Sequence, residues 1–208
     1  GTARSLLSVL ADLRNHPTAA IAAVPVVVDA TWSHEEILAR VIAKACGGRG
    51  LSREQSRPVV VYAGYINRRL VGEGVALEDT PRGVVLGEPG VGKSEVVKTI
   101  MKYAEARGCA HRVRITAYTG CAAALIGGST TTSLRGGGRY GKGSKAKLQE
   151  QFADAILLIV DEHSMLSLDE TGRLLDAVRT GQSRDTPGGD LAMLFLGDFA
   201  QYPPVGCE

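Results

Sequence analysis

Residues 87–94 have the sequence Gly-Glu-Pro-Gly-Val-Gly-Lys-Ser, the most specific pattern in the chain for its fold class. It fits the pattern G-x-x-x-x-G-K-[ST], in which a glycine-rich loop (a P-loop) wraps around a phosphate group. The apolar residues 83–86 before it predict a strand, and a helix is expected from about Ser94 to Arg107. The motif requires this order of strand, loop and helix, so the pattern favours a phosphate site over a chance glycine turn.

The residue types in this loop suit phosphate binding. Gly90 and Gly92 let the backbone turn and direct N–H groups inward, and the helix that follows adds the positive end of its dipole. Lys93 is expected to reach the β- and γ-phosphates, and Ser94 to bind Mg²⁺. The residues expected to contact the nucleotide here are Gly87, Glu88, Pro89, Gly90, Val91, Gly92, Lys93, Ser94 and Glu95.

A second candidate site follows the apolar run 155–161, which predicts a strand ending on Asp161. Ligands collect at the carboxyl ends of parallel strands. Asp161 is therefore expected to hold the metal ion through water, and Glu162 to act as general base on the attacking water. The alternative is that both carboxylates only solvate the strand end, and the P-loop upstream favours the functional interpretation. We interpret the adjacent His163 as a spectator.

The rest of the chain has the pattern of an α/β protein. Strands are predicted at 112–116 and 191–197, and a helix at 169–180. Continuous apolar strands that alternate with helices indicate a parallel sheet covered by helices on both faces. The predicted fold class is therefore a P-loop nucleotide-binding fold with a mainly helical N-terminal extension.

That extension shows helical patterning without recognisable chemistry. Residues 3–14 have helical spacing, and residues 24–30 suit a strand. Ser33 and Glu36 form a capping box that opens a helix through about Cys46. No candidate functional residue is identified in this part of the chain.

A second capping box, Ser52 with Gln55, begins the next segment. The run 57–71 is ambiguous, because its β-branched residues favour a strand while its apolar spacing suits a helix; we expect a helix. The chain is thus divided into residues 1–50, an extension of unknown role, and residues 51–208, the P-loop domain.

Composition excludes some classes of protein. The 208 residues are 44% hydrophobic and carry a net charge of +2, which fits a globular domain and does not by itself indicate a nucleic-acid partner. Four widely spaced cysteines without a C-x-x-C pair make a zinc site unexpected. Their number and spacing favour reduced thiols, so we expect an intracellular protein. No apolar run approaches the length of a membrane-spanning helix, and no membrane partner is expected.

Three further segments resemble a known family. Residues 115–136 (ITAYTGCAAALIGGSTTTSLRG), 158–166 (LIVDEHSML) and 194–206 (LFLGDFAQYPPVG) are similar to motifs Ia, II and III of the PIF-type (petite integration frequency) helicases. These helicases form part of the RecD-like branch of superfamily 1. The P-loop is similar to their motif I, and residues 51–55 (LSREQ) to their Q-motif. The resemblance implies the first RecA-like motor domain of an ATP-dependent DNA helicase that moves 5′ to 3′.

The resemblance also implies roles for single residues. Gln55 would contact the adenine edge, and Gln201 would sense the γ-phosphate and relay its presence to DNA. ATP and Mg²⁺ are the implied cofactors, and single-stranded or forked DNA the implied partner. The residues that would line the single-strand path are Thr119, Gly120, Thr130 and Ser133. Departures from the family pattern at His163, Thr132 and Tyr202 remove no phosphate or metal ligand.

The segment 135–147 (RGGGRYGKGSKAK) carries five basic residues and no acidic one. Arg135 and Arg139 are candidate contacts to the DNA backbone, with Tyr140 stacking on a base. A mobile, solvated loop is the alternative, and the sequence leaves both open.

Helicases of this superfamily have a second RecA-like domain, and no motif of one is found up to residue 208. We therefore expect this chain to be a fragment of a longer protein, with nucleotide binding but little ATP turnover and no unwinding. The alternative is a nucleotide-dependent regulatory or scaffold module without translocation. Repair, recombination and telomere roles occur in the family, and the sequence chooses neither among them nor an oligomeric state.

Overall fold

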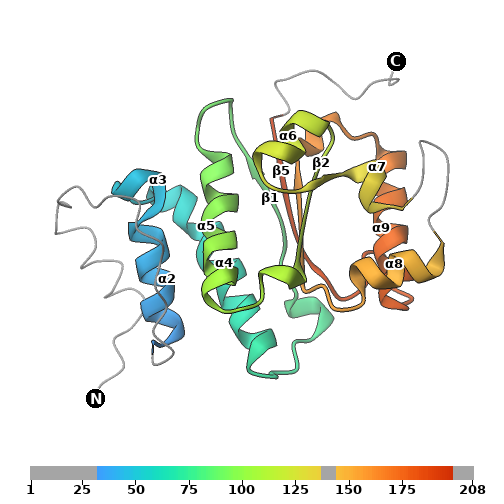
Figure 1. Cartoon of the computed structure of the whole chain (residues 1–208), viewed down its shortest axis with the longest axis horizontal. Helices are drawn as coiled ribbons and strands as arrows, with labels where there is room; N and C mark the ends of the chain where they lie inside the picture. The colour runs from blue at the N-terminus through green and yellow to red at the C-terminus, as the bar shows by residue number, and fades with distance from the viewer. Residues whose placement is uncertain (1–31, 137–143, 199–208) are drawn as a thin grey trace.

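A five-stranded parallel sheet forms the centre of the computed structural model, which describes residues 32–136 and 144–198 (Figure 1). The order across the sheet is β1-β5-β4-β2-β3, and every neighbouring pair is parallel. The predicted α/β fold class is thereby confirmed. The strands are β1 (Arg82–Leu86), β2 (Val113–Ala117), β3 (Ser129–Thr130), β4 (Leu157–Asp161) and β5 (Ala192–Gly197).

Helices lie on both faces of the sheet (Figure 1). One face is covered by α2 (His34–Ala43), α4 (Arg53–Leu70) and α5 (Lys93–Ala106), with the short α3 (Ala45–Gly48) beside them. The other face is covered by α8 (Lys145–Phe152) and α9 (Leu168–Gln182). Two short helices follow β2 and β3 at their carboxyl ends, namely α6 (Gly120–Leu125) and α7 (Thr131–Leu134). Single 3-10 turns are η1 (Leu77–Asp79), η2 (Ala110–Arg112) and η3 (His163–Met165).

The sheet separates two apolar cores, and β4 contributes to both. Leu157 and Ile159 belong to the core beneath α2, α4 and α5, whereas Leu158 and Val160 belong to the core beneath α8 and α9. All four side chains are 0% exposed. This burial on both faces is why the strand is continuously apolar rather than alternating.

Both predicted capping boxes are present. The Ser33 hydroxyl accepts from the backbone N–H of Glu36, the Ser52 hydroxyl accepts from that of Gln55, and both pairs are reciprocal. The ambiguous run 57–71 is helical within α4, as predicted. The helix that Ser33 caps, α2, ends at Ala43 rather than near Cys46.

The break after α2 has a backbone cause. Cys46 and Gly47 have φ values of 53° and 68°, in the left-handed region that no regular helix contains. The described part of the N-terminal extension is nevertheless packed, because Val41 of α2 lies in the same core as Ile66 of α4 and Ile100 of α5. The sequence boundary placed after residue 50 therefore does not separate two cores.

Several predictions fall outside the described residues. They are the helix at 3–14, the strand at 24–30, the DNA contacts Arg139 and Tyr140, and Gln201. Among the described helices, none combines the length and the apolar composition that crossing a membrane requires.

Candidate nucleotide and DNA site

The P-loop connects β1 to α5, and its glycines are required by geometry. Gly90 and Gly92 have φ values of 81° and 87°, which side-chain-bearing residues adopt only with strain. A Cβ on Gly92 would also lie 2.3 Å from Nε2 of Gln55. The positive φ is what requires glycine at position 92, because the Gln55 amide is the end of a flexible side chain that could move away from a Cβ.

Lys93 is the first residue of α5, and its side chain turns back over the loop. Its ammonium group donates to the carbonyl oxygens of Gly87 and Glu88, the latter at 3.0 Å. The cation therefore lies inside the turn of the P-loop, where it can exchange carbonyl partners for phosphate oxygens.

Two other predicted nucleotide contacts have protein partners of their own. Gln55 donates from Nε2 to the carbonyl of Val91 at 2.9 Å, so the Q-motif contacts the P-loop directly. Glu95 instead accepts from Lys98 at 2.8 Å and from the backbone N–H of Cys46 at 3.4 Å. The Glu95 carboxylate thus ties the start of α5 to α3. Ser94 is exposed at the start of α5.

Asp161 ends β4 at the carboxyl edge of the sheet, beside Ala117 of β2. Burial raises the pKa of its carboxyl above the ordinary value, while the hydrogen bond from the Glu162 N–H and the positive charge of Lys93 oppose this rise. No ion pair neutralises Asp161 within residues 32–136 and 144–198. The fold therefore brings a half-buried carboxylate without an ion-pair partner within reach of the P-loop lysine's charge.

Glu162 adopts a left-handed backbone conformation, with φ 54° and ψ 32°. Non-glycine residues in this region are strained and concentrate at functional sites. Its carboxylate oxygen Oε2 accepts two hydrogen bonds from Thr119, at 2.8 Å from Oγ1 and at 3.2 Å from the backbone N–H. The candidate general base therefore contacts the first residue of the predicted DNA path.

The other predicted DNA contacts lie on α6 and α7, beyond the ends of β2 and β3. Thr119 caps α6 through the N–H of Ala122 at 3.2 Å, and Thr130 caps α7 through the N–H of Ser133 at 3.1 Å. Gly120 and Ser133 are exposed. Arg135 is only 6% exposed, and its Nε has no hydrogen-bond partner, so this guanidinium is not presented to solvent in the described structure.

The end of β5 contacts the segment that follows Glu162. The backbone N–H of Asp198 donates to the Ser164 hydroxyl at 3.3 Å. A Cβ on Gly197 would lie 3.1 Å from the Ser164 nitrogen, so only a glycine allows this approach without displacement. Ser164 is a contact that the sequence patterns did not predict, although it follows Asp161 closely within motif II.

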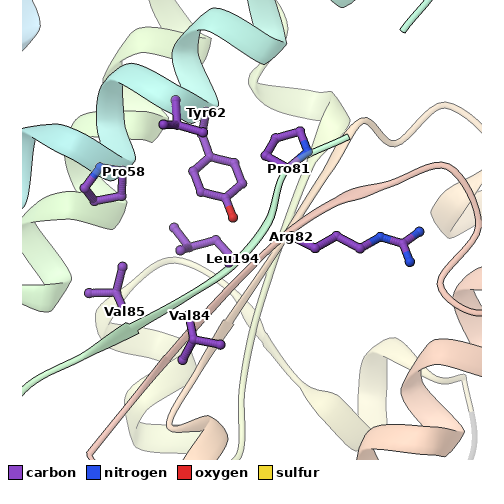
Figure 2. A pocket seen from close by; sticks show the side chains of 9 residues that line it. Pro58, Tyr62, Pro81, Arg82, Val84, Val85 and Leu194 are labelled. Atoms are coloured by element: carbon purple, nitrogen blue, oxygen red, sulfur yellow. The ribbon is translucent and has the colours of Figure 1, made fainter. Parts of the chain in front are cut away.

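A pocket of about 340 Å³ lies elsewhere, between α4 and the edge strand β1 (Figure 2). Figure 2 shows Tyr62 extending from α4 toward the strands, while Arg82 points away from it. The guanidinium of Arg82 donates to the carbonyls of Pro187 and Gly189, at 3.3 and 2.7 Å. None of the predicted site residues lines this pocket, so it is separate from the nucleotide edge.

The donor set at the sheet edge suits magnesium. The Ser94 hydroxyl and the Asp161 carboxylate are oxygen ligands, which hard divalent cations prefer. In the part of the chain that the structure describes, no three His, Cys, Asp or Glu side chains gather as an all-protein metal cluster. Magnesium usually needs only one or two such protein ligands together with phosphate and water.

Comparison with known proteins gives the family. A family model described as an AAA domain matches residues 75–207. The helicase RRM3 of Saccharomyces cerevisiae is 34% identical over 131 residues, covering 57% of this chain and 18% of the relative. Human PIF1 is 30% identical over 127 residues, covering 57% of this chain and 19% of the relative.

Solved structures of Pif1 helicases are similar to this chain in fold as well as in sequence. The Pif1 helicase from Candida albicans is 27% identical with a TM-score of 0.57, covering 74% of this chain and 34% of that one. Bacteroides Pif1 in complex with ADP-AlF3 and ssDNA is 27% identical with a TM-score of 0.56, covering 76% of this chain and 34% of that one. This chain thus spans about a fifth of the curated relatives and a third of the solved chains. It is similar in sequence to the ATP-dependent DNA helicases RRM3 and PIF1 and in fold to Pif1 helicases, and it belongs to the AAA-domain family.

Proposed function

We propose that this chain is the ATP-binding and ATP-hydrolysing part of a DNA helicase that moves 5′ to 3′ along single-stranded DNA. One observation carries the proposal. Thr119, at the start of the predicted DNA path, donates two hydrogen bonds to Glu162, and Glu162 follows the half-buried Asp161, which the charge of Lys93 reaches. The proposed nucleotide site and the proposed DNA-contacting segment would therefore be adjacent at one edge of the sheet.

The proposed nucleotide roles are supported by contacts within the P-loop. Lys93 turns over the loop and is proposed to bind the β- and γ-phosphates. Gln55 contacts the loop at Val91 and is proposed, from the Q-motif resemblance, to contact the adenine. Glu162 is the general base that orients the attacking water. Ser94 and Asp161 would hold Mg²⁺, which neutralises phosphate charge when it is bound. Gln201 is proposed as the γ-phosphate sensor from the motif III resemblance.

The DNA partner is proposed from the relatives together with the α6–α7 surface. Structures of Pif1 proteins include complexes with ssDNA and with forked dsDNA. Thr119, Gly120, Thr130 and Ser133 offer hydroxyls and N–H groups, which contact phosphates without recognising sequence. A second RecA-like domain is the proposed partner for unwinding. A DNA substrate would place the protein inside the cell, and in the nucleus of a eukaryote.

Nucleotide binding can be tested by a pair of lysine variants on one helix. Titration of a fluorescent ATP analogue with Mg²⁺ is expected to show binding to the wild type. Lys93→Ala should lose affinity by about tenfold or more, because a hydrogen bond to a charged group contributes about 1.5–3 kcal/mol. Lys98→Ala removes the same charge from an exposed position of α5 that pairs with Glu95, and should bind as wild type. Equal loss in both variants would contradict the proposed site.

Single-strand binding is tested separately, by anisotropy of a labelled oligothymidylate at several salt concentrations. The proposal requires binding that weakens steeply as salt rises. Nucleotide binding without any DNA binding at low salt would instead support the regulatory module. Turnover by this chain alone is expected to be low, and strong DNA-stimulated ATP hydrolysis would contradict that expectation.

A further inference from the structure

Thr119 donates two hydrogen bonds to the same carboxylate oxygen of Glu162. Its hydroxyl and its backbone N–H both donate to Oε2 of Glu162, at 2.8 and 3.2 Å. Charge-assisted hydrogen bonds of this kind are stronger than those between neutral groups. In the described structure the donors of Thr119 are therefore committed to the carboxylate 43 residues away.

The same donors lie at the boundary with solvent. Thr119 is half-buried, and the next two residues, Gly120 and Cys121, are exposed at the start of α6. A phosphate oxygen approaching this helix start would seek the same N–H and O–H hydrogens as a carboxylate does. Each hydrogen can serve one strong acceptor at a time, so the two anions exclude each other at Thr119.

The backbone of Glu162 is held independently of this contact. Its N–H donates to Oδ1 of Asp161 at 2.9 Å, and its carbonyl accepts from the N–H of Met165 at 2.9 Å. These bonds fix the left-handed turn on the end of β4. The carboxylate can therefore leave Thr119 by side-chain rotation alone, without displacing Asp161 or the strand.

We propose that Thr119 is a positioning residue. It holds the Glu162 carboxylate away from the attacking water until a phosphate of single-stranded DNA takes over the two donors of Thr119. The inference rests on the proposed function, which supplies both the DNA strand and the general base. It gives the motor a direct link between occupancy of the DNA path and release of the catalytic carboxylate.

Competition for shared donors has a reciprocal consequence. If DNA displaces Glu162 from Thr119, then removing the Glu162 carboxylate must strengthen DNA binding, and only while Thr119 can donate. A residue that merely supports the fold would not produce this conditional gain in affinity.

The test is a double-mutant cycle on this chain, with the affinity for labelled oligothymidylate measured by anisotropy at low salt without nucleotide. Glu162→Ala is expected to tighten binding about fivefold or more, the usual scale of coupling between sites. In the Thr119→Val background the same substitution should change the affinity much less. Thr119→Ser retains the hydroxyl and should restore the full effect of Glu162→Ala.

Two controls separate competition from charge and from loss of a helix cap. Asp161→Asn removes one negative charge at the neighbouring position and should tighten DNA binding less than Glu162→Ala does. Ser144→Ala removes the hydroxyl cap of α8, which accepts from the N–H of Lys147 at 3.3 Å, and should leave the DNA affinity unchanged. Thermal melts confirm that each variant is folded, and Thr119→Ala, which also lacks the hydroxyl, replaces Thr119→Val if that variant does not fold.

The possible results separate failure of the inference about Thr119 from failure of the proposed function. DNA binding in which Glu162→Ala acts equally in both Thr119 backgrounds, or does not act at all, overturns the inference and leaves the proposed function standing. Absence of DNA binding by the folded wild type overturns the proposed function and the inference together.

Discussion

The side-chain amide of Gln55 donates a hydrogen bond to the carbonyl oxygen of Val91 at 2.9 Å, which joins the first turn of α4 to the P-loop. The other end of the same side chain is also engaged, since its Oε1 accepts from the N–H of Ser52 at 2.9 Å. Gln55 therefore links a helix cap to the phosphate-binding loop. The capping function needs only the acceptor oxygen, whereas the link to the loop needs the amide donor.

Gln55→Glu separates these two functions. A glutamate can still accept from Ser52, so the cap of α4 is kept, but it cannot donate to the Val91 carbonyl. Loss of one such hydrogen bond costs about 0.5–1.5 kcal/mol of folding stability, so a small fall in melting temperature is expected. ATP affinity is also expected to fall, because the Val91 carbonyl of the loop is no longer held and the amide is no longer available to the adenine. Isothermal titration with ATP and with GTP measures the effect. A ratio of ATP to GTP affinity equal to that of the wild type would show that Gln55 does not contact the adenine.

Gly181 and Gly172 of α9 should respond to alanine in opposite directions. A Cβ at Gly181 would lie 2.4 Å from the carbonyl oxygen of Leu148 and 2.8 Å from Cβ of Phe152, both on α8. Overpacking of this kind costs about 1–3 kcal/mol, so Gly181→Ala should lower the free energy of unfolding by about that amount. No atom lies within 4 Å of a Cβ at Gly172, and Gly172→Ala should raise it by about 1 kcal/mol through helix propensity. Urea unfolding checks both, and a stable Gly181→Ala protein would contradict the close packing of α8 on α9.

The Asp161 carboxylate is expected to cost stability when no nucleotide is present. Burial raises its pKa, which means that the fold disfavours the charged form present at neutral pH. Asp161→Asn should therefore raise the melting temperature in nucleotide-free buffer at pH 7, and should lose the additional stabilisation that Mg²⁺ and ATP give the wild type. Glu88→Gln, at an exposed position of the P-loop, should leave the nucleotide-free melting temperature unchanged. A lower melting temperature for Asp161→Asn would indicate a stabilising structural role instead.

His34 is expected to make folding stability depend on pH. Burial lowers the pKa of its imidazole from 6.5, Glu35 opposes this shift, and Arg107 adds to it. The unfolded chain therefore binds a proton at a higher pH than the folded chain, and stability is lost as the pH falls below about 6.5. The ring nitrogen Nδ1 lies 2.6 Å from the Tyr103 hydroxyl, whose pKa is raised by burial, so the tyrosine stays neutral throughout.

His34→Gln removes this titration. Urea unfolding at pH 7.5 and pH 5.0 should show a smaller loss of stability in the variant than in the wild type, since the other histidines contribute equally to both proteins. Parallel losses in the two proteins would show that His34 is accessible to protons in the folded state.

Local sequence patterns predicted much of this fold because they depend on consecutive residues. The P-loop glycines at 90 and 92, the caps at Ser33 and Ser52 and the apolar strand β4 all satisfy requirements of their own backbone or of burial on both faces. The spacing of apolar residues also decided between strand and helix for the run 57–71 within α4. Val59, Ala63 and Ile66 lie on one buried stripe of the helix and are each 0% exposed.

Elements with weak local signals were missed. In α8 only Leu148 and Phe152 are buried, so its apolar pattern is too sparse to distinguish a helix from a loop. Strand β3 consists of Ser129 and Thr130, polar residues that join the sheet only because β2 supplies partners for them. The burial of Arg135 could not be expected from a glycine-rich basic stretch either.

The sequence by itself determined the phosphate loop, the strand-end carboxylates and the parallel sheet that presents them, since each follows from local backbone and burial requirements. Only the tertiary structure decided which of these features touch. Thr119 meets Glu162, and Gln55 meets Val91, because parallel strands and packed helices bring distant segments to one edge of the sheet. Contacts across 43 and 36 residues depend on the packing of whole elements, and no local pattern in a single chain records that packing.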